Sequence, residues 1–381
     1  MPKCPRTAGT AQGRQMQTSS EPAFYWIGLN SVPGVGRITF RKLVQQFGSP
    51  EQVLTAPQNV LKETDGLSDK ILAGIASQKW REQAEKELAS AAQAGVAIIT
   101  LDDDRFPENL RNTPDPPLYL YVRGSIEPDD KRAVAIVGTR TPTHYGRTVT
   151  QRFGYELASA GLTVVSGMAR GVDTQAHQGA LDAGGRTIAV LGCGIDRVYP
   201  PENRGLMHEI STKGAVVTEY PFGTRPEAGF FPARNRIISG LSRGTVIIEA
   251  AEDSGSLITA GDALKQGRKL FAVPGNVSAP NSRGPNNLIK QGAMLVEQPA
   301  DVLNALNMRP GSRREGGQAN APLSEEESAL FRHVAVEPRH IDAITSECGN
   351  TAGKTGGLLL SLELKGLVRQ LPGKYFVRSE E

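Results

Sequence analysis

The chain has 381 residues, of which 39% are hydrophobic and 22% are charged. These proportions are those of globular proteins, and they exclude a disordered chain, a coiled coil and a membrane protein. Forty-three basic and 40 acidic residues leave a net charge of +3, which alone indicates no class of partner. At roughly 100 to 200 residues per domain, the length predicts two or three domains.

The N-terminus and the cysteines indicate the compartment. Residues 1–22 are polar and lack the apolar stretch of a secretion signal, so they predict a disordered tail. Cys4, Cys193 and Cys348 are odd in number and far apart in the sequence, which predicts neither a disulfide framework nor a zinc site. We therefore expect a cytoplasmic protein.

Residues 23–95 predict a helical domain. Gly34 and Gly36 indicate a tight hairpin followed by an amphipathic helix, as in a helix-hairpin-helix or SAM-like module, whose amides can hold a DNA phosphate. A second, weaker copy spans residues 64–72. The alternative is a hairpin that serves packing alone, and 8 basic against 7 acidic residues between positions 24 and 95 do not decide between the two.

Residues 96–308 alternate short apolar runs with helical patterns, which predicts a Rossmann-type parallel sheet with crossover helices. Such a sheet binds ligands outside the carboxyl ends of its strands. The expected strands are 133–137, 162–165, 187–191, 215–219, 245–249, 269–273 and 293–297.

Residues 309–322 read as a Gly-rich linker, and residues 323–381 predict three helices and a hairpin, a winged helix. Residues 131–306 contain 19 basic and 14 acidic residues, whereas residues 323–381 contain 7 basic and 9 acidic residues. Because phosphate affinity follows positive charge, we expect any basic binding face on the middle domain and a docking or steric role for the end domain. The alternative is a winged helix that holds duplex through Arg369 and Arg378.

Three segments of the middle domain offer groups for phosphate. The loops after the first and second strands contain small residues that expose backbone amides, and the first loop adds the planar guanidinium of Arg140. The helix after the second loop is expected to have Asp173 or Thr174 as its N-cap. The third segment is the start of a helix, just after two phenylalanines in the sequence. Its arginines could bind phosphate, and a base could stack on an aromatic ring. We expect one of its two arginines to pair instead with Glu219 or Glu249. The candidate residues are Gly138, Thr139, Arg140, Ser166, Gly167, Ala169, Gly171, Arg234, Asn235 and Arg236.

The sequence of this domain supports a catalytic site less well than a phosphate-binding site. Asp173 and His177 lie four residues apart on one helix face, which fits an acid–base pair or, alternatively, a helix cap and a core histidine. Cys193 lacks a close basic neighbour, so we expect a buried structural thiol. The G-x-G-x-x-G fingerprint of NAD or FAD proteins is absent, and no triad or metal-ligand spacing occurs among the five histidines.

The loops together resemble the DprA/Smf family of DNA-processing proteins. The resemblance runs in family order through the middle domain. It rests on the segments 135–140, 166–173 with His177, Tyr199-Pro200 with Asn203, 231–238, Glu249-Ala250, 254–260, 273–275 and 284–289. Thr139 stands where the family usually has Ser, and Pro201 stands where some members have Lys.

The resemblance implies a non-enzymatic, cofactor-free homodimer that binds single-stranded DNA and helps load RecA recombinase during natural transformation. It also implies that the ten candidate residues line the DNA site. One alternative is a nucleotide hydrolase resembling the lysine-decarboxylase-like phosphoribohydrolases, but their Pro-Gly-Gly-x-Gly-Thr-x-x-Glu loop has no glutamate counterpart at 254–260. A third reading is a scaffold whose loops bind no phosphate.

Overall fold

The computed structural model describes residues 20–64, 67–308, 323–335, 337–364, 367–371 and 373–378. The chain forms two compact units, Met1–Arg313 and Arg314–Glu381. The N-terminal helices and the sheet therefore belong to the same unit. Most of the expected N-terminal tail, and all of the expected linker at 309–322, lie outside the described residues.

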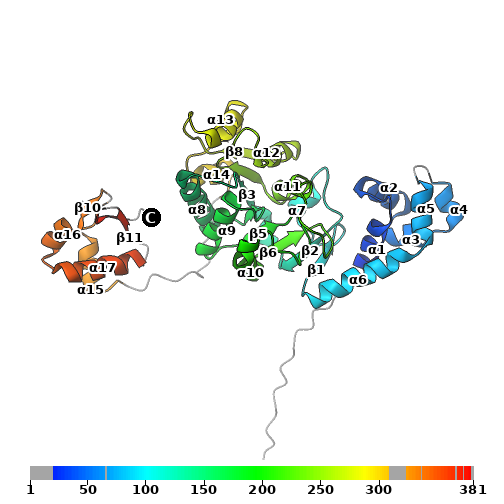
Figure 1. Cartoon of the computed structure of the whole chain (residues 1–381), viewed down its shortest axis with the longest axis horizontal. Helices are drawn as coiled ribbons and strands as arrows, with labels where there is room; N and C mark the ends of the chain where they lie inside the picture. The colour runs from blue at the N-terminus through cyan, green and yellow to red at the C-terminus, as the bar shows by residue number, and fades with distance from the viewer. Residues whose placement is uncertain are drawn as a thin grey trace, which may run out of the picture. The chain divides into compact units, whose positions relative to one another are not determined.

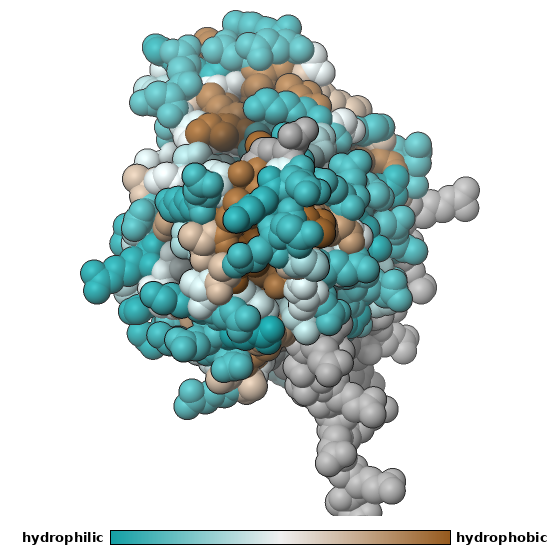
Figure 2. Space-filling model, turned by 90° about the vertical axis from the view of Figure 1, so that its right-hand side faces the viewer, coloured by the Kyte–Doolittle hydropathy of each residue, from teal (hydrophilic) through white to brown (hydrophobic). Residues whose placement is uncertain are grey.

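Six helices, blue to cyan in Figure 1, precede the sheet. Gly34, with a φ of 96°, turns the chain between the first two, and Gly36 is the N-cap of the second, as the hairpin pattern predicts. Trp26, Phe40 and Trp80 pack into the core of this part, and Figure 2, which views the molecule from this side, shows a mostly hydrophilic exterior. The helices are α1 (Ser20–Ser31), α2 (Arg37–Phe47), α3 (Pro50–Thr55), α4 (Gln58–Lys62), α5 (Asp69–Ala76) and α6 (Lys79–Gln93).

A nine-stranded sheet forms the centre of the first unit, in the order β1-β2-β6-β5-β4-β3-β7-β8-β9. All seven expected strands form, and they run parallel. Two further strands, which the sequence pattern did not predict as part of this sheet, extend it antiparallel beside β6. The strands are β1 (Ala97–Thr100), β2 (Tyr119–Gly124), β3 (Val134–Val137), β4 (Val164–Ser166), β5 (Thr187–Val190), β6 (Ala215–Thr218), β7 (Gly244–Ile247), β8 (Lys269–Ala272) and β9 (Met294–Leu295).

Helices cover both faces of the sheet. Along β3, Val134 and Ile136 pack on the side of α8, α9 and α14, whereas Ala135 and Val137 pack on the side of α7, α11 and α12. The strand is apolar throughout because both of its faces are buried. The helices are α7 (Glu108–Arg111), α8 (His144–Ser159), α9 (Val172–Asp182), α10 (Arg204–Lys213), α11 (Phe230–Leu241), α12 (Ser256–Lys265), α13 (Arg283–Lys290) and α14 (Pro299–Ala305).

The second unit is a winged helix, as expected. Leu330, Ile344, Leu359 and Phe376 form its core. A short strand, β10, joins the predicted hairpin, so the sheet has three strands in the order β10-β12-β11. Its elements are α15 (Glu325–Phe331), β10 (Arg339–His340), α16 (Ile341–Cys348), α17 (Ala352–Leu364), β11 (Val368–Leu371) and β12 (Tyr375–Arg378). Across the described residues of both units, no helix is long and apolar enough to cross a membrane.

Candidate nucleic-acid interface

The loop between β4 and α9 is built by close backbone approach. Gly171 has a φ of 78°, and a Cβ there would lie 2.6 Å from the carbonyl groups of Thr139 and Arg140. A Cβ on Gly167 would lie 2.7 Å from the Asp173 carboxylate and 2.8 Å from the Arg234 guanidinium. Glycine at both positions therefore lets the loops after β3 and β4 meet beside Arg234.

Buried polar side chains hold this loop. Asp173 accepts the Ala169 N–H at 3.1 Å, and the Asn203 side chain donates to the Met168 carbonyl at 3.1 Å. Met168 is itself buried at a φ of 63°, a conformation that needs such support in a residue other than glycine. The predicted N-cap is wrong: α9 begins at Val172 with Gly171 as its N-cap, because the Asp173 carboxylate binds back into the preceding loop.

A pocket opens where the loops after β3, β4 and β5 meet the start of α11. Four of the ten candidate residues line it: Arg140, Gly167, Ala169 and Arg234. The remaining lining residues are Arg170, Leu191, Gly192, Cys193, Tyr199, Pro200 and Phe231. The pocket thus lies at the carboxyl edge of the parallel strands, as the sheet type predicts.

Phe231 is the aromatic centre of the pocket. The exposed Arg140 guanidinium lies 5.5 Å from the centre of the Phe231 ring. The centre of the Tyr199 ring lies 5.4 Å from that of Phe231, and the two ring planes make an angle of 35°. Gly192 leaves room for Phe231, since a Cβ there would lie 2.9 Å from that ring. An exposed cation over one aromatic ring, with a second ring packed against the first, is suited to a phosphate next to an unpaired base.

Arg234 lies beneath the pocket rather than at its mouth. It is 3% exposed and donates to the Gly167 carbonyl at 2.6 Å and to the Val190 carbonyl. Burial lowers the pKa of Arg234, and the negative charge of Asp173 partly opposes this shift. Burial raises the pKa of Asp173, and the positive charge of Arg234 partly opposes that shift. Through its two hydrogen bonds, Arg234 therefore ties the loop after β4 to the end of β5 and to α11.

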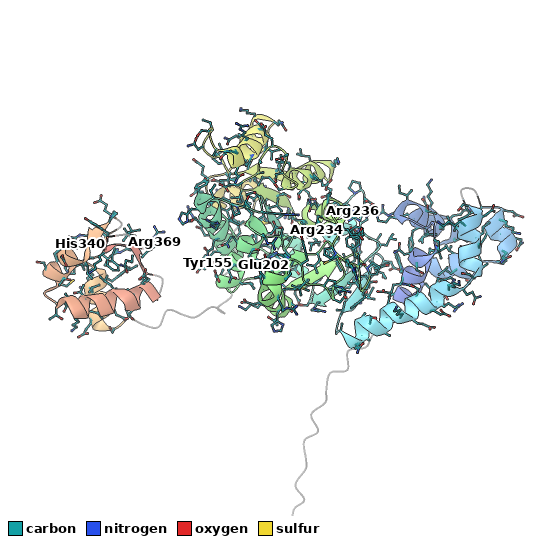
Figure 3. All side chains as sticks on the ribbon, viewed as in Figure 1. Tyr155, Glu202, Arg234, Arg236, His340 and Arg369 are labelled. Carbon is teal, nitrogen blue, oxygen red and sulfur yellow. The ribbon has the colours of Figure 1, made fainter. Side chains whose placement is uncertain are left out.

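Arg236, two residues further along α11, is the structural arginine that the sequence pattern anticipates. It pairs with Glu219 at 2.7 Å and with Asp115 at 3.1 Å. Figure 3 shows Arg236 on the side toward the N-terminal helices and Arg234 nearer the middle of the sheet. The other expected partner, Glu249, instead accepts the Thr143 N–H at 2.8 Å.

The remaining candidate residues support the loops from outside the pocket lining. Ser166 is fully buried and its hydroxyl donates to the Ile136 carbonyl at 2.7 Å. Thr139 accepts the Thr141 N–H at 3.2 Å, and Asn235 donates to the Gly255 carbonyl at 3.3 Å. Gly138 packs closely against Val172, since a Cβ on Gly138 would lie 2.7 Å from the Val172 side chain.

The acid–base reading of Asp173 and His177 does not fit this geometry. His177 is fully buried and its Nδ1 meets the Thr187 hydroxyl at 2.7 Å, while burial lowers its pKa to about 3. It is therefore a neutral core histidine. Cys193 is buried, as expected, and this burial raises the pKa of its thiol to about 11. Among the described residues, no cluster of His, Cys, Asp or Glu could hold a metal ion.

Three further pocket residues were not among the predicted site residues: Arg170, Tyr199 and Pro200. All three sit in loops that follow parallel strands, and that position is the signal which could have found them. Arg170 pairs with Glu202, a contact between two loops that spacing along the chain does not predict.

Comparisons with known proteins agree with this architecture. Residues 97–307 match the family model of DNA recombination-mediator protein A, and residues 315–374 match that of the DprA winged helix domain. Protein Smf of Synechocystis is 35% identical over 94% of this chain and 99% of its own length. Protein Smf of Escherichia coli is 38% identical over 77% of this chain and 81% of its own.

Two solved structures are similar as well. DNA processing protein A of Streptococcus pneumoniae is 33% identical, with a TM-score of 0.65 over 74% of this chain and 97% of that one. The Helicobacter pylori protein, described for its single-stranded DNA binding mode, is 35% identical, with a TM-score of 0.50 over 55% of this chain and 95% of that one. By its family-model matches and by its relatives along almost the whole length, the chain belongs to the DprA/Smf family of DNA-processing proteins.

Proposed function

We propose that this protein binds single-stranded DNA at the pocket beneath Arg140, without catalysing a reaction on it. The observation that carries the proposal is the exposed Arg140 guanidinium over the Phe231 ring, against which the Tyr199 ring packs. This arrangement offers a cation for a phosphate and aromatic faces for a base. The Helicobacter pylori relative, described as binding single strands, supports the same assignment.

The pocket suits unpaired strands because it lies among loops at strand ends. A duplex presents its bases inside grooves, which are read by an inserted helix or ribbon, whereas a single strand can place a base against Phe231 directly. The family further supports a cytoplasmic homodimer that protects incoming DNA and helps load RecA recombinase during natural transformation.

Binding without catalysis agrees with the groups that line the pocket. Arg140 and Arg170 offer positive charge to a phosphate, and no carboxylate or imidazole stands among the residues that line the pocket. Burial raises the pKa of the Cys193 thiol to about 11, so this sulfur is a poor nucleophile. The first turn of α12, at the position of the hydrolase glutamate loop, contains no acidic residue.

The test is the affinity for oligo-dT and for a duplex of equal length over a salt series. Single strands should bind more tightly. If the protein neutralises roughly 3 to 5 phosphates, log affinity should fall against log salt with a slope of about −2 to −4. A slope near zero, or a preference for duplex, contradicts the proposal.

Replacing Arg140 by alanine should weaken oligo-dT binding by roughly 10- to 150-fold, the loss of a hydrogen bond to a charged group, at about 1.5 to 3 kcal/mol. Arg140 is exposed, so thermal unfolding should not change. Arg243→Ala is the matched control, since Arg243 is exposed just before β7, at the opposite edge of the parallel strands. Equal affinity of the two folded variants would remove Arg140 from the site.

A further inference from the structure

A cluster of ion pairs joins the N-terminal helices to the sheet. Arg37 and Arg41 project from α2, the helix that follows the hairpin. Asp115 precedes β2, and Glu219 directly follows β6. Asp115 lies 3.1 Å from Arg37 and 3.0 Å from Arg41. The arginines of the hairpin module are thus bound by carboxylates of the same unit.

Glu219 is shared between the two parts of this cluster. Its Oε2 lies 3.3 Å from Arg37 and 2.7 Å from Arg236 of α11. The side chains of Glu219 and Arg236 are 12% and 10% exposed, whereas that of Arg37 is 37% exposed. Ion pairs shielded from water in this way hold their geometry more firmly than surface pairs.

The same helix, α11, carries Arg234 into the loops of the pocket. Residues two apart on a helix point to different sides of it, so Arg234 reaches the loop after β4 while Arg236 reaches the cluster. Phe231, the aromatic centre of the pocket, stands in the first turn of this helix. A displacement of α11 at Arg236 would therefore move both pocket residues.

We propose that Arg37 is a positioning residue for the pocket, acting through Glu219 and Arg236 on α11, and that the hairpin module aligns the DNA site rather than holding a phosphate with this arginine. The proposal rests on the proposed function, because its readout is the affinity for single strands. Arg37 bridges Asp115 and Glu219 with one planar fork, which a lysine could not reproduce.

The test compares Arg37→Ala with Lys42→Ala in the full chain. Lys42 is exposed on the same helix, and no ion pair within the described part of the chain involves it, so this variant removes the same charge from α2 without touching the cluster. Arg37→Ala should weaken oligo-dT binding by roughly 3- to 30-fold, a typical coupling between sites. The salt slope should stay unchanged. Lys42→Ala should match the unaltered protein.

A double-mutant cycle of Arg37→Ala with Glu219→Gln supplies the second measurement. If both residues act through one path, their combined effect on affinity should be smaller than the product of the single effects. Equal affinity of Arg37→Ala and Lys42→Ala overturns the proposal. A salt slope reduced by about 0.7 in Arg37→Ala also overturns it, since that change means a lost phosphate contact. Failure of the unaltered protein to bind oligo-dT would instead overturn the proposed function, and this proposal with it.

Discussion

Arg234→Met should lower the free energy of unfolding by about 2 to 5 kcal/mol, because two buried carbonyl groups each lose their donor at roughly 1 to 3 kcal/mol. The substitution leaves the Gly167 and Val190 carbonyls without this donor, and it removes a positive charge that opposes the burial of the Asp173 carboxylate. The loop after β4 then loses its tie to α11, so oligo-dT affinity should fall together with stability. Denaturant unfolding and oligo-dT titration of the same preparation measure both effects.

The stability loss of Arg234→Met should depend on pH. Burial raises the pKa of Asp173 above its ordinary value of 3.8, so ionised Asp173 opposes folding and protonated Asp173 does not. The deficit should therefore be largest near neutral pH and should shrink as the pH falls toward 3.8. A deficit that is constant with pH would show that the charge of Asp173 does not contribute to it.

Arg236→Met is the matched control, since it removes a second buried arginine from the same helix. Glu219 keeps Arg37 as a partner in this variant, so the loss of stability should be smaller than for Arg234→Met. Arg236 does not line the pocket, and its effect on affinity should also be smaller. Equal effects of the two substitutions on affinity would contradict the separate roles assigned to these arginines.

Gly171→Ala should separate the loops after β3 and β4. The backbone at Gly171, with φ of 78° and ψ of −122°, is that of a type II′ turn, which favours glycine. A Cβ would also meet three backbone atoms of Thr139 and Arg140 at 2.6 Å. Strain and overlap together should cost about 2 to 5 kcal/mol of stability, and the shift of Arg140 should weaken oligo-dT binding at least about tenfold.

Gly223→Ala is the control for this substitution. Gly223 has a φ of 79°, and a Cβ there would meet no atom within 4 Å. Only the cost of the left-handed backbone, about 1 to 2 kcal/mol, should appear, with affinity for oligo-dT unchanged. Thermal unfolding and oligo-dT titration of both variants check the comparison. If Gly171→Ala binds as well as Gly223→Ala, contact between these loops does not shape the site.

The sequence by itself determined most of the sheet and its binding edge. The runs that became β3 to β8 were readable because a strand buried on both faces is almost continuously apolar, whereas β9 is short and exposed at the edge of the sheet. The order of strand, glycine-rich loop and helix placed Arg140, Gly167 and Ala169 at the carboxyl edge, where the pocket lies. Even the pairing of one arginine with Glu219 could be anticipated, since a charge in a helix that packs on a sheet needs a partner.

Only the tertiary structure decided which arginine of α11 holds the pocket loop and which pairs with carboxylates. Arg234 and Arg236 are equivalent by pattern, and their roles follow from the neighbours that the fold supplies: a loop carbonyl for one, Glu219 and Asp115 for the other. The start of α9 likewise depended on Asp173 binding back to Ala169. Apolar periodicity is a local property that the chain carries wherever it folds, whereas the partner of a buried charge is set by segments distant in sequence that packing brings within about 3 Å.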